Sequence, residues 1–289
     1  MGFVGLVSDS TAGLPPEVVE RHGVRLVPLY ITFGDQVFRE GVDLSYEAFY
    51  QRLPNADPLP TTSQPSPGDF AKAYRELAEA GAESIISIHL SSGISGTISS
   101  AQLAAQDLTI PVAILDTQCA AAVHRLAVEA AATSLAQGNG HEAAVRAAEA
   151  VIANHRTAFV VDTLEYLHKG GRIGGASALL GSMLQLKPLL HFVDGQITSL
   201  EKVRSSARAL DRLVEIMAEW MGAEEPMRII LMHSACPERA EACAAMLEQR
   251  LQVAALDSVL LTPVIGAHVG PGTLGICCCP SRLAPRADA

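Results

Sequence analysis

The alternation of short apolar runs with helical segments in the first half of the chain most constrains its fold. Apolar runs of strand length, at residues 3–8, 84–90 and 111–115, are each followed by a segment with a helical pattern. Strands that are separated by helices run parallel, and the sheet that they form needs cover on both faces. The pattern therefore predicts a parallel, three-layer α/β/α unit.

The second half of the chain has a different pattern. Asp194-Gly195 stands between two apolar runs, and this dipeptide is a strong signal for a β-hairpin. A helix is expected over residues 205–221, and further strands and helices follow it to residue 279. This mixture predicts an α+β unit with a mixed sheet. We place the boundary near residue 155, which gives domains 1–155 and 156–289 with a ligand groove between them.

Three local expectations are specific enough to be tested by a structure. Residues 24–33 read as one strand, which Gly34-Asp35 turns back into residues 36–39. Residues 54–67 are polar and rich in proline, and they are expected to break all periodicity. A helical face in the second half supplies apolar residues at helical spacing, namely Ala176, Leu179, Leu180, Met183 and Leu184.

Charge and composition exclude several classes of function. The net charge is −10 and no cluster of Lys and Arg occurs, which argues against a nucleic-acid partner. The start of the chain lacks a basic region followed by a long apolar segment, and the longest apolar runs are far short of a membrane span. The six cysteines lack metal-ligand spacing and are expected to be buried thiols. A cytoplasmic location is the default expectation.

Hydroxyl-bearing residues and glycines follow the expected strands. They occur in Asp9-Ser10-Thr11, in the loop at 61–66, and in the segment 91–97, which reads Ser-Ser-Gly-Ile-Ser-Gly-Thr. Ligands of open parallel sheets bind at the carboxyl ends of strands, and free backbone N–H groups at helix starts attract anions. Each of these hydroxyls could simply cap a helix. Their density in 91–97 favours a site that binds a carboxylate or a phosphate.

Motifs for nucleotide and metal chemistry fail in their context. Gly270–Gly275 matches G-x-G-x-x-G literally, but it opens no long helix and too little chain follows for a ribose-binding acid. Neither a Walker A sequence nor an H-E-x-x-H pair is present. We therefore expect no cofactor and no metal site.

A serine hydrolase is the main catalytic alternative. Ser95, Asp116 and His268 occur in the chain order of α/β-hydrolase triads, but Thr97 stands where the nucleophile elbow requires glycine. The segment 169–173, Lys-Gly-Gly-Arg-Ile, fits a phosphate contact or an ordinary helix end equally well. A sensor of a small phosphate compound is a third alternative, and it would require a short polar pocket.

Taken together, five segments resemble those of the DegV family in order and spacing over nearly the full chain. They are Asp9-Ser10-Thr11, Thr62-Ser63-Gln64-Pro65-Ser66, the segment 91–97, Lys169–Ile173 and His268-Val269-Gly270-Pro271-Gly272. The resemblance implies two α/β domains with a fatty acid between them, its carboxylate held by Thr62 and Ser95 with His268 close by. It implies supporting roles for the loop residues Ser10, Ser92, Gly96, Thr97, Gly170, Gly171 and Arg172.

Some DegV proteins are similar to the binding subunits of bacterial fatty acid kinases, which present the carboxylate to a separate ATP-using partner. The resemblance therefore implies a non-catalytic carrier of a long-chain fatty acid, for which Arg204 is the expected contact with the kinase. An anion site without a nucleotide motif agrees with this division of labour. The tail is expected in an apolar tunnel, for which Leu179, Leu180, Met183 and Leu184 are candidates from their pattern alone.

Overall fold

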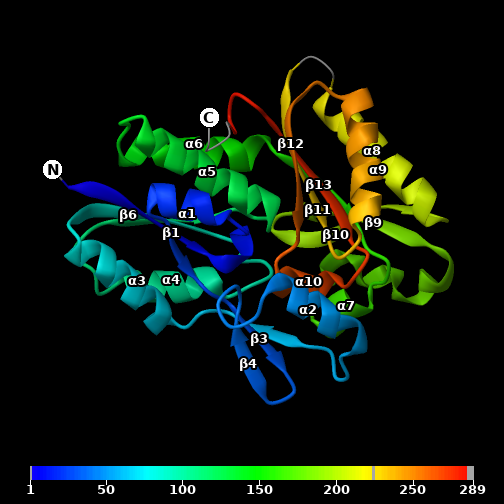
Figure 1. The fold of residues 1–289 in the computed structure, drawn as a ribbon, viewed down its shortest axis with the longest axis horizontal. Coiled ribbons are helices and arrows are strands. Elements are labelled where there is room, and N and C mark those ends of the chain that lie inside the picture. The colour runs from blue at the N-terminus through cyan, green and yellow to red at the C-terminus, as the bar shows by residue number, and fades with distance from the viewer. Residues whose placement is uncertain (1, 223–224, 285–289) are drawn as a thin grey trace.

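The computed structural model describes residues 2–222 and 225–284, apart from the side chains of residues 180–185. Figure 1 shows the fold. The strands are β1 Phe3–Asp9, β2 Arg25–Val27, β3 Tyr30–Phe33, β4 Gln36–Arg39, β5 Thr61–Ser63, β6 Ala82–His89, β7 Val112–Asp116, β8 Arg156–Val160, β9 Lys187–Val193, β10 Gln196–Val203, β11 Met227–His233, β12 Val253–Leu260 and β13 Leu274–Pro280. The α-helices are α1 Pro16–His22, α2 Tyr46–Arg52, α3 Pro67–Glu79, α4 Thr97–Ala105, α5 Ala122–Ala136, α6 His141–Asn154, α7 Glu165–Lys169, α8 Ser206–Met221, α9 Pro237–Arg250 and α10 Pro263–Val269, and the 3-10 helices are η1 Ser10–Ala12, η2 Leu53–Asn55 and η3 Gly174–Gln185.

The first sheet has the predicted parallel, three-layer architecture. Its strand order is β2-β1-β6-β7, and every neighbouring pair is parallel. Successive side chains of a strand point to opposite faces, so Leu6 packs with α1, α5 and α6 while Val7 packs with α3 and α4. The carboxyl ends of β1 and β6 lie side by side, and they bring Ser10 and the segment 91–97 to the same edge of the sheet.

The second sheet is mixed, as the sequence predicts. Its order is β10-β9-β8-β13-β11-β12, in which only the pair β11 and β12 is parallel among the described strands. Asp194 and Gly195 both have positive φ at the turn between β9 and β10, which the expected hairpin requires. All strands of this sheet follow residue 155, whereas the other strands precede it. The division into domains at residue 155 stays a prediction.

A third, small sheet corrects two expectations. Residues 24–33 do not form one strand, because the chain leaves β2 at Pro28 and continues as β3 in another sheet. Proline supplies no N–H for a ladder at that point. Residues 61–63 lie within the segment expected to lack structure, yet they form β5, which pairs antiparallel with β3. This pairing is what gives Thr62 a fixed position.

Helices α5 and α6 lie between the two large sheets and join them (Figure 1). The core around them contains Ile86 and Val123 from the first half and Ile230 and Cys277 from the mixed sheet. The opposite face of the mixed sheet is covered by α8 and α9, which pack on a separate core. The two halves are therefore in continuous apolar contact.

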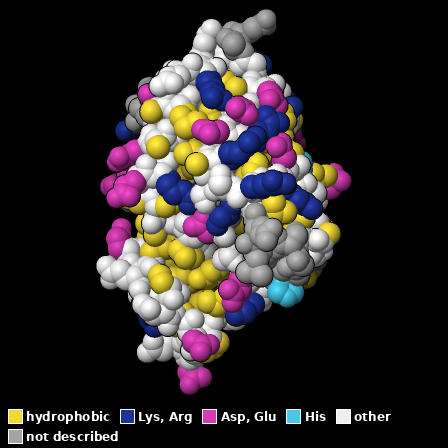
Figure 2. All heavy atoms as spheres, turned by 90° about the vertical axis from the view of Figure 1, so that its right-hand side faces the viewer, with side chains coloured by type: hydrophobic (Ala, Val, Ile, Leu, Met, Phe, Trp, Pro, Cys, Tyr) yellow, Lys and Arg dark blue, Asp and Glu magenta, His cyan; other side chains and the backbone are white. Residues whose placement is uncertain are grey.

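The outer surface beside α8 and α9 carries charges of both signs (Figure 2). On α8, Arg212 contacts the carboxylates of Glu201, Glu215 and Glu219. In the part of the chain that the structure describes, no helix has both the length and the apolarity to cross a bilayer.

Candidate functional site

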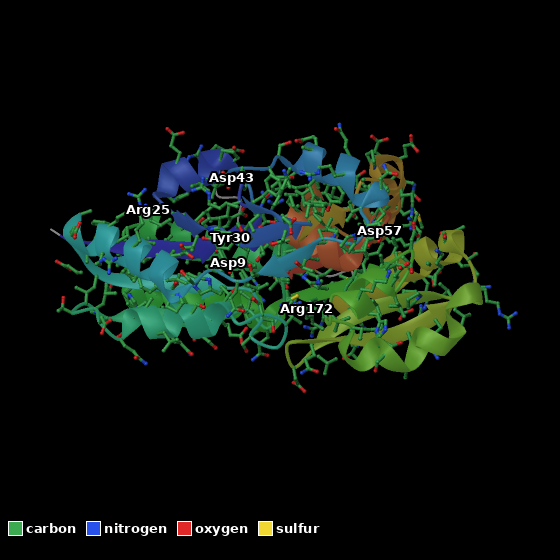
Figure 3. The ribbon with its side chains drawn as sticks, turned by 90° about the horizontal axis from the view of Figure 1, so that it is seen from below. Asp9, Arg25, Tyr30, Asp43, Asp57 and Arg172 are labelled. Atoms are coloured by element: carbon green, nitrogen blue, oxygen red, sulfur yellow. The ribbon has the colours of Figure 1, made fainter. Side chains whose placement is uncertain are left out.

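A cavity lies where the parallel sheet, the small sheet and the mixed sheet meet, and Arg172 lies at this junction (Figure 3). It encloses about 820 Å³ of space, including its open mouth. Its wall is mainly apolar and is built by side chains from both halves, namely Leu29, Leu90, Ile94, Ala120, Ala121, Phe159, Leu167, Phe192, Ile197, Met232, Leu261, Val264, Ile265 and Val269.

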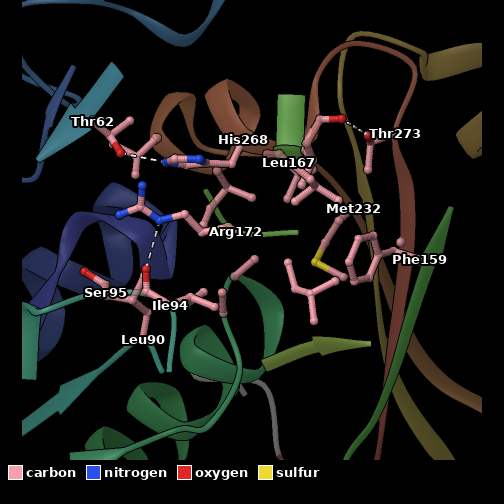
Figure 4. A pocket seen from close by; sticks show the side chains of 18 of the residues that line it. Thr62, Leu90, Ile94, Ser95, Phe159, Leu167, Arg172, Met232, His268 and Thr273 are labelled. Carbon is pink, nitrogen blue, oxygen red and sulfur yellow. Dashed lines mark hydrogen bonds between the residues drawn. The ribbon is translucent and has the colours of Figure 1, made fainter. Parts of the chain in front are cut away.

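Polar side chains gather at one end of this cavity. Thr62, Ser95, Arg172 and His268 lie together there, whereas Phe159 and Met232 lie toward the other end (Figure 4). They come from β5, from the loop before α4, from the loop after α7, and from α10. The sequence-predicted residues Thr62, Ser95 and His268 are thus brought to one place from three separate segments. We call these four residues the polar end.

Thr62 and His268 are in direct contact. The Oγ1 atom of Thr62 lies 2.7 Å from Nε2 of His268, and Nδ1 of the same ring is buried without a hydrogen-bond partner. Burial, and then the charge of Arg172, lower the pKa of His268 to about 4. The imidazole is therefore neutral at pH 7. If its proton is on Nε2, the ring donates to Thr62 and leaves the threonine hydroxyl hydrogen free for a ligand.

Ser95 is held within its own loop. Its Oγ lies 2.9 Å from Oγ1 of Thr97, and the backbone N–H of Thr97 also contacts it. A Cβ at Gly96 would lie 2.5 Å from the side-chain amide of Gln64, so glycine permits this close approach and a larger residue would displace the Gln64 side chain. The loop of Ser95 and the strand of Thr62 are therefore packed against each other, which fixes the spacing of their two hydroxyls.

Arg172 supplies the positive charge of the polar end. Its Nε donates to the carbonyl of Ile94 at 3.1 Å, and NH1 donates to the carbonyl of Gly170 at 2.7 Å. These bonds connect the loop after α7 to the loop that precedes Ser95. Burial lowers the pKa of Arg172, but an arginine stays charged at neutral pH. A half-buried guanidinium beside two hydroxyls is suited to an anion.

Gly170 lies directly under the ring of His268. A Cβ at this position would be 2.3 Å from Nδ1 of His268 and 2.8 Å from the carbonyl of Tyr166. Gly170→Ala is therefore expected to push the imidazole out of its buried position. Because burial is the main cause of its low pKa, the pKa of His268 should rise from about 4 toward its ordinary value near 6.5.

NMR titration of the histidine side chains measures this shift, and His268→Gln identifies the signal. Gly68→Ala is the matched control, because a Cβ there meets only Ser66 Oγ at 3.5 Å, an ordinary contact. An unchanged pKa of His268 in Gly170→Ala would show that the ring is not held by this contact.

Other predicted residues lie around the polar end without lining the main cavity. The Ser10 hydroxyl is bonded to Glu40, and Ser92 donates to Asp116. Ser92, Gly96 and Gly171 line a neighbouring polar hollow, which shares Ser95 and Arg172 with the main cavity. Arg204 is exposed in the turn between β10 and α8.

The expected tail contacts are corrected in part. Leu179 is buried, but it is not among the residues that line the cavity. It belongs to η3, a 3-10 helix whose side chains follow a different spacing from that of the α-helical face we assumed. The side chains of Leu180, Met183 and Leu184 lie outside the described residues.

The geometry does not assemble the hydrolase triad. Ser95 is bonded to Thr97, His268 to Thr62, and Asp116 to Ser92 and Gln118. Each side chain of the triad order thus has a different partner. A general base must lie within hydrogen-bond reach of its nucleophile, and the described contacts give no such pair.

Sequence reasoning missed several features of the site. His268 lies on α10, a helix that begins with Pro263 and that was not predicted. Proline at the first helical position was an available signal for this helix. Gln64 and Leu29 were also missed as lining residues, because their positions depend on the pairing of β3 with β5.

The chain is similar to proteins described as members of one family. A family model described as an uncharacterised protein of the DegV family matches residues 4–281. A DegV domain-containing protein of Streptomyces coelicolor is 44% identical over 274 residues, which are 94% of this chain and 97% of that protein. Protein DegV of Bacillus subtilis is 35% identical over 278 residues, which are 96% and 99% of the two chains.

Solved structures of similar sequence have the same fold. One is described as fatty acid binding of a DegV family protein from Thermus thermophilus, with 35% identity, a TM-score of 0.90, and coverage of 96% of this chain and 99% of that chain. DegV of Bacillus subtilis, described as a fatty acid binding protein, has 34% identity, a TM-score of 0.87, and coverage of 97% and 100%. A stearic acid-binding protein from Eubacterium ventriosum has 27% identity, a TM-score of 0.87, and coverage of 96% and 98%. The chain belongs to the DegV family.

Proposed function

We propose that this protein binds a long-chain fatty acid without transforming it, with the carboxylate at the polar end and the acyl tail in the cavity. The observation that carries the proposal is the division of one cavity into a polar end, where a guanidinium lies beside two hydroxyls, and a remainder whose lining is mainly apolar, with Thr157 and Thr273 as the exceptions. The DegV proteins of known structure that are described as fatty acid binding support it, and so does the similar stearic acid-binding protein. A sensor of a small phosphate compound would need a short polar pocket, which this cavity is not.

The polar end is suited to a carboxylate. Burying an ionised carboxylate is costly unless donors replace the water that it loses. In our proposal the hydroxyls of Thr62 and Ser95 donate to the carboxylate oxygens, and the guanidinium of Arg172 supplies the opposite charge. Neutral His268 holds the Thr62 hydroxyl in place through their 2.7 Å contact, so the ligand need not order it.

The apolar wall is suited to the acyl tail. Burial of each methylene group contributes about 0.8 kcal/mol to binding. Side chains from both halves surround the cavity, so a bound tail would contact Leu90 and Ile94 on one side and Phe159 and Met232 on the other. The tail therefore supplies affinity, and the carboxylate supplies orientation.

Native mass spectrometry of the gently purified protein tests this proposal. We expect an added mass that corresponds to a long-chain fatty acid, and its release on denaturation. The same preparation after delipidation should take up an added fatty acid in a 1:1 ratio. A protein that carries no such mass and does not take up fatty acid after delipidation would contradict the proposal. Ester hydrolysis that Ser95→Ala abolishes would instead support the hydrolase.

The proposal includes presentation of the carboxylate to a separate kinase, which would form an acyl phosphate. Support comes from the polar hollow next to the cavity, where Ser95 and Arg172 are shared by both spaces. A carboxylate held there would be next to the opening through which a partner's phosphoryl donor could approach. The sequence contains no nucleotide motif of its own, so the nucleotide would be bound by the partner. Exposed Arg204 is the proposed contact with that partner.

Hydroxylamine trapping tests the presentation step, because hydroxylamine converts an acyl phosphate into a hydroxamate and phosphate. We expect hydroxamate only when the loaded protein, ATP and a bacterial fatty acid kinase subunit are combined. Arg204→Ala should lower its rate of formation without changing fatty acid affinity. Arg146→Ala removes another exposed arginine and should have no effect. Equal rates for Arg204→Ala and Arg146→Ala would contradict the assigned contact.

A further inference from the structure

Glu40 is a buried carboxylate outside the cavity, and it connects the two sides of the polar end. It follows β4, and its exposed fraction is only 2%. Its Oε2 accepts a hydrogen bond from the Ser10 hydroxyl at 2.5 Å, and its Oε1 accepts one from the backbone N–H of Val264 at 2.6 Å. Burying an ionised carboxylate costs free energy unless donors replace the water that it loses. Here two donors from distant segments replace that water with charge-assisted hydrogen bonds.

On one side, Glu40 holds the end of β1. The Ser10 oxygen that donates to Glu40 also accepts from the backbone N–H of Leu29 at 2.9 Å, and Leu29 lines the cavity. The backbone N–H of Glu40 in turn donates to the carbonyl of Leu29. Since β1 pairs directly with β6, this network is anchored to the strand that leads into the loop of Ser95.

On the other side, Glu40 holds the first turn of α10. The side chain of Thr262, at the N-cap position, makes no capping bond, so the N–H of Val264 depends on Glu40 for its partner. Val264, Ile265 and His268 lie along α10 and all face the cavity. A shift of this short helix would therefore move the cavity wall and the imidazole that contacts Thr62.

We infer that Glu40 is a positioning residue, which fixes α10 relative to the strand that leads to Ser95 and so sets the geometry in which a carboxylate is recognised. The inference rests on the proposed function. Glu40 does not line the cavity, so it acts on the ligand through Ser10, Leu29 and α10.

The protonation state of Glu40 separates a positioning role from a purely structural one. Only a positioning role makes carboxylate recognition depend on pH. Burial raises the pKa of Glu40 to about 7, although contacts with the Ser10 hydroxyl, the Val264 N–H and the Thr262 hydroxyl oppose the shift. The ionisable groups that face it are Asp9, with a pKa of about 2, and Tyr46 and Tyr50, whose pKa values burial raises. None of these three changes its charge between pH 6 and 8, and neither does His268.

The ionised carboxylate accepts from both donors, whereas protonation turns Oε2 into a donor and removes the charge that attracts Val264 N–H. Carboxylate recognition should therefore weaken as the pH falls from 8 to 6. Glu40→Gln keeps the shape but cannot ionise, and it should remove this pH dependence. Glu40→Ala removes both bonds and should weaken recognition at every pH.

The experiment compares the Kd of a fatty acid with that of the fatty alcohol of equal chain length, so that the ratio reports carboxylate recognition alone. For the wild type, we expect the preference for the acid to fall about threefold from pH 8 to pH 6. Glu40→Gln should show a lower, pH-independent preference, and Glu40→Ala should lower the preference at pH 8 by about tenfold, the size of one hydrogen bond to a charged group.

Leu247→Ala is the control for general destabilisation, because Leu247 is fully buried in the core between α8, α9 and the mixed sheet, away from the cavity. It should leave the preference unchanged. Equal weakening of acid and alcohol by both Glu40 variants would overturn the inference, and so would a pH dependence that persists in Glu40→Gln. If Glu40→Ala does not fold, Glu40→Gln alone decides. A wild type that binds neither compound would overturn the proposed function itself.

Discussion

Combining Thr62→Val with Ser95→Ala is expected to weaken fatty acid binding by about 10²- to 10⁴-fold. Each variant removes a hydroxyl that we propose as a donor to the carboxylate, and a hydrogen bond to a charged group contributes about 1.5–3 kcal/mol. The loss would leave Arg172 and the apolar wall to retain the ligand. Displacement of a fluorescent fatty acid from the delipidated protein measures the two dissociation constants.

Thr61→Val is the matched control for this double variant. Thr61 precedes Thr62 on β5 but is exposed, because successive side chains of a strand point to opposite faces. It has the same chemistry on the same strand and should leave the affinity unchanged. A double variant that binds as tightly as Thr61→Val would show that the hydroxyls do not hold the carboxylate.

Asp9→Ala is expected to lower the free energy of unfolding by about 3–5 kcal/mol, the usual cost of breaking a buried, paired charge. Asp9 is fully buried at the end of β1 and accepts hydrogen bonds from the backbone N–H groups of Thr11 and Leu90. It also contacts Nδ1 of His89 at 3.0 Å. These groups would lose their partner together, and Leu90 directly precedes the loop that carries Ser95. Urea unfolding at pH 7 measures the loss.

The pH dependence of unfolding tests the same residue. Burial acts to raise the pKa of Asp9, but His124, His89 and Thr11 outweigh it and lower the pKa to about 2. A carboxyl whose pKa is lower in the folded protein contributes stability above its unfolded pKa, and this contribution disappears as the pH falls from about 4 to about 2. Asp9→Ala should lack that contribution.

Asp43→Ala is the control for the Asp9 variant. Asp43 pairs with Arg39 at 2.8 Å on the exposed surface, where water and salt screen the interaction. Its loss should change the free energy of unfolding little. An Asp9→Ala protein as stable as Asp43→Ala would contradict the structural role that the buried contacts assign to Asp9.

The architecture could be predicted from the sequence wherever the signal was local. The spacing of apolar runs predicted the parallel sheet, and Asp194-Gly195 predicted the hairpin of the mixed sheet, because both depend on residues close in the chain. The small sheet could not be predicted in the same way. Strand β5 has three residues and no apolar pattern, and it exists because it pairs with β3 about thirty residues earlier.

Most residues of the polar end could be predicted from the sequence, but the contacts between them could not. The resemblance to the DegV family identified Thr62, Ser95 and His268, and the structure brings all three to one end of the cavity. The contact between Thr62 and His268 joins residues 206 positions apart, so no local pattern could reveal it. Glu40 was missed for the same reason, since it follows an exposed hairpin and looks like a surface acid until Val264 is placed beside it.

We propose that the hydroxyls of Thr62 and Ser95 hold an ionised carboxylate in this cavity. NMR of the protein loaded with a fatty acid that carries ¹³C at its carboxyl carbon tests this proposal. We predict that the bound carboxylate stays ionised as the pH falls to about 4, because donors that bind the charged form lower its pKa. The double variant should shift the signal and raise that pKa. A bound carboxyl group that titrates as it does in water, with the same chemical shift in wild type and double variant, would contradict the claim.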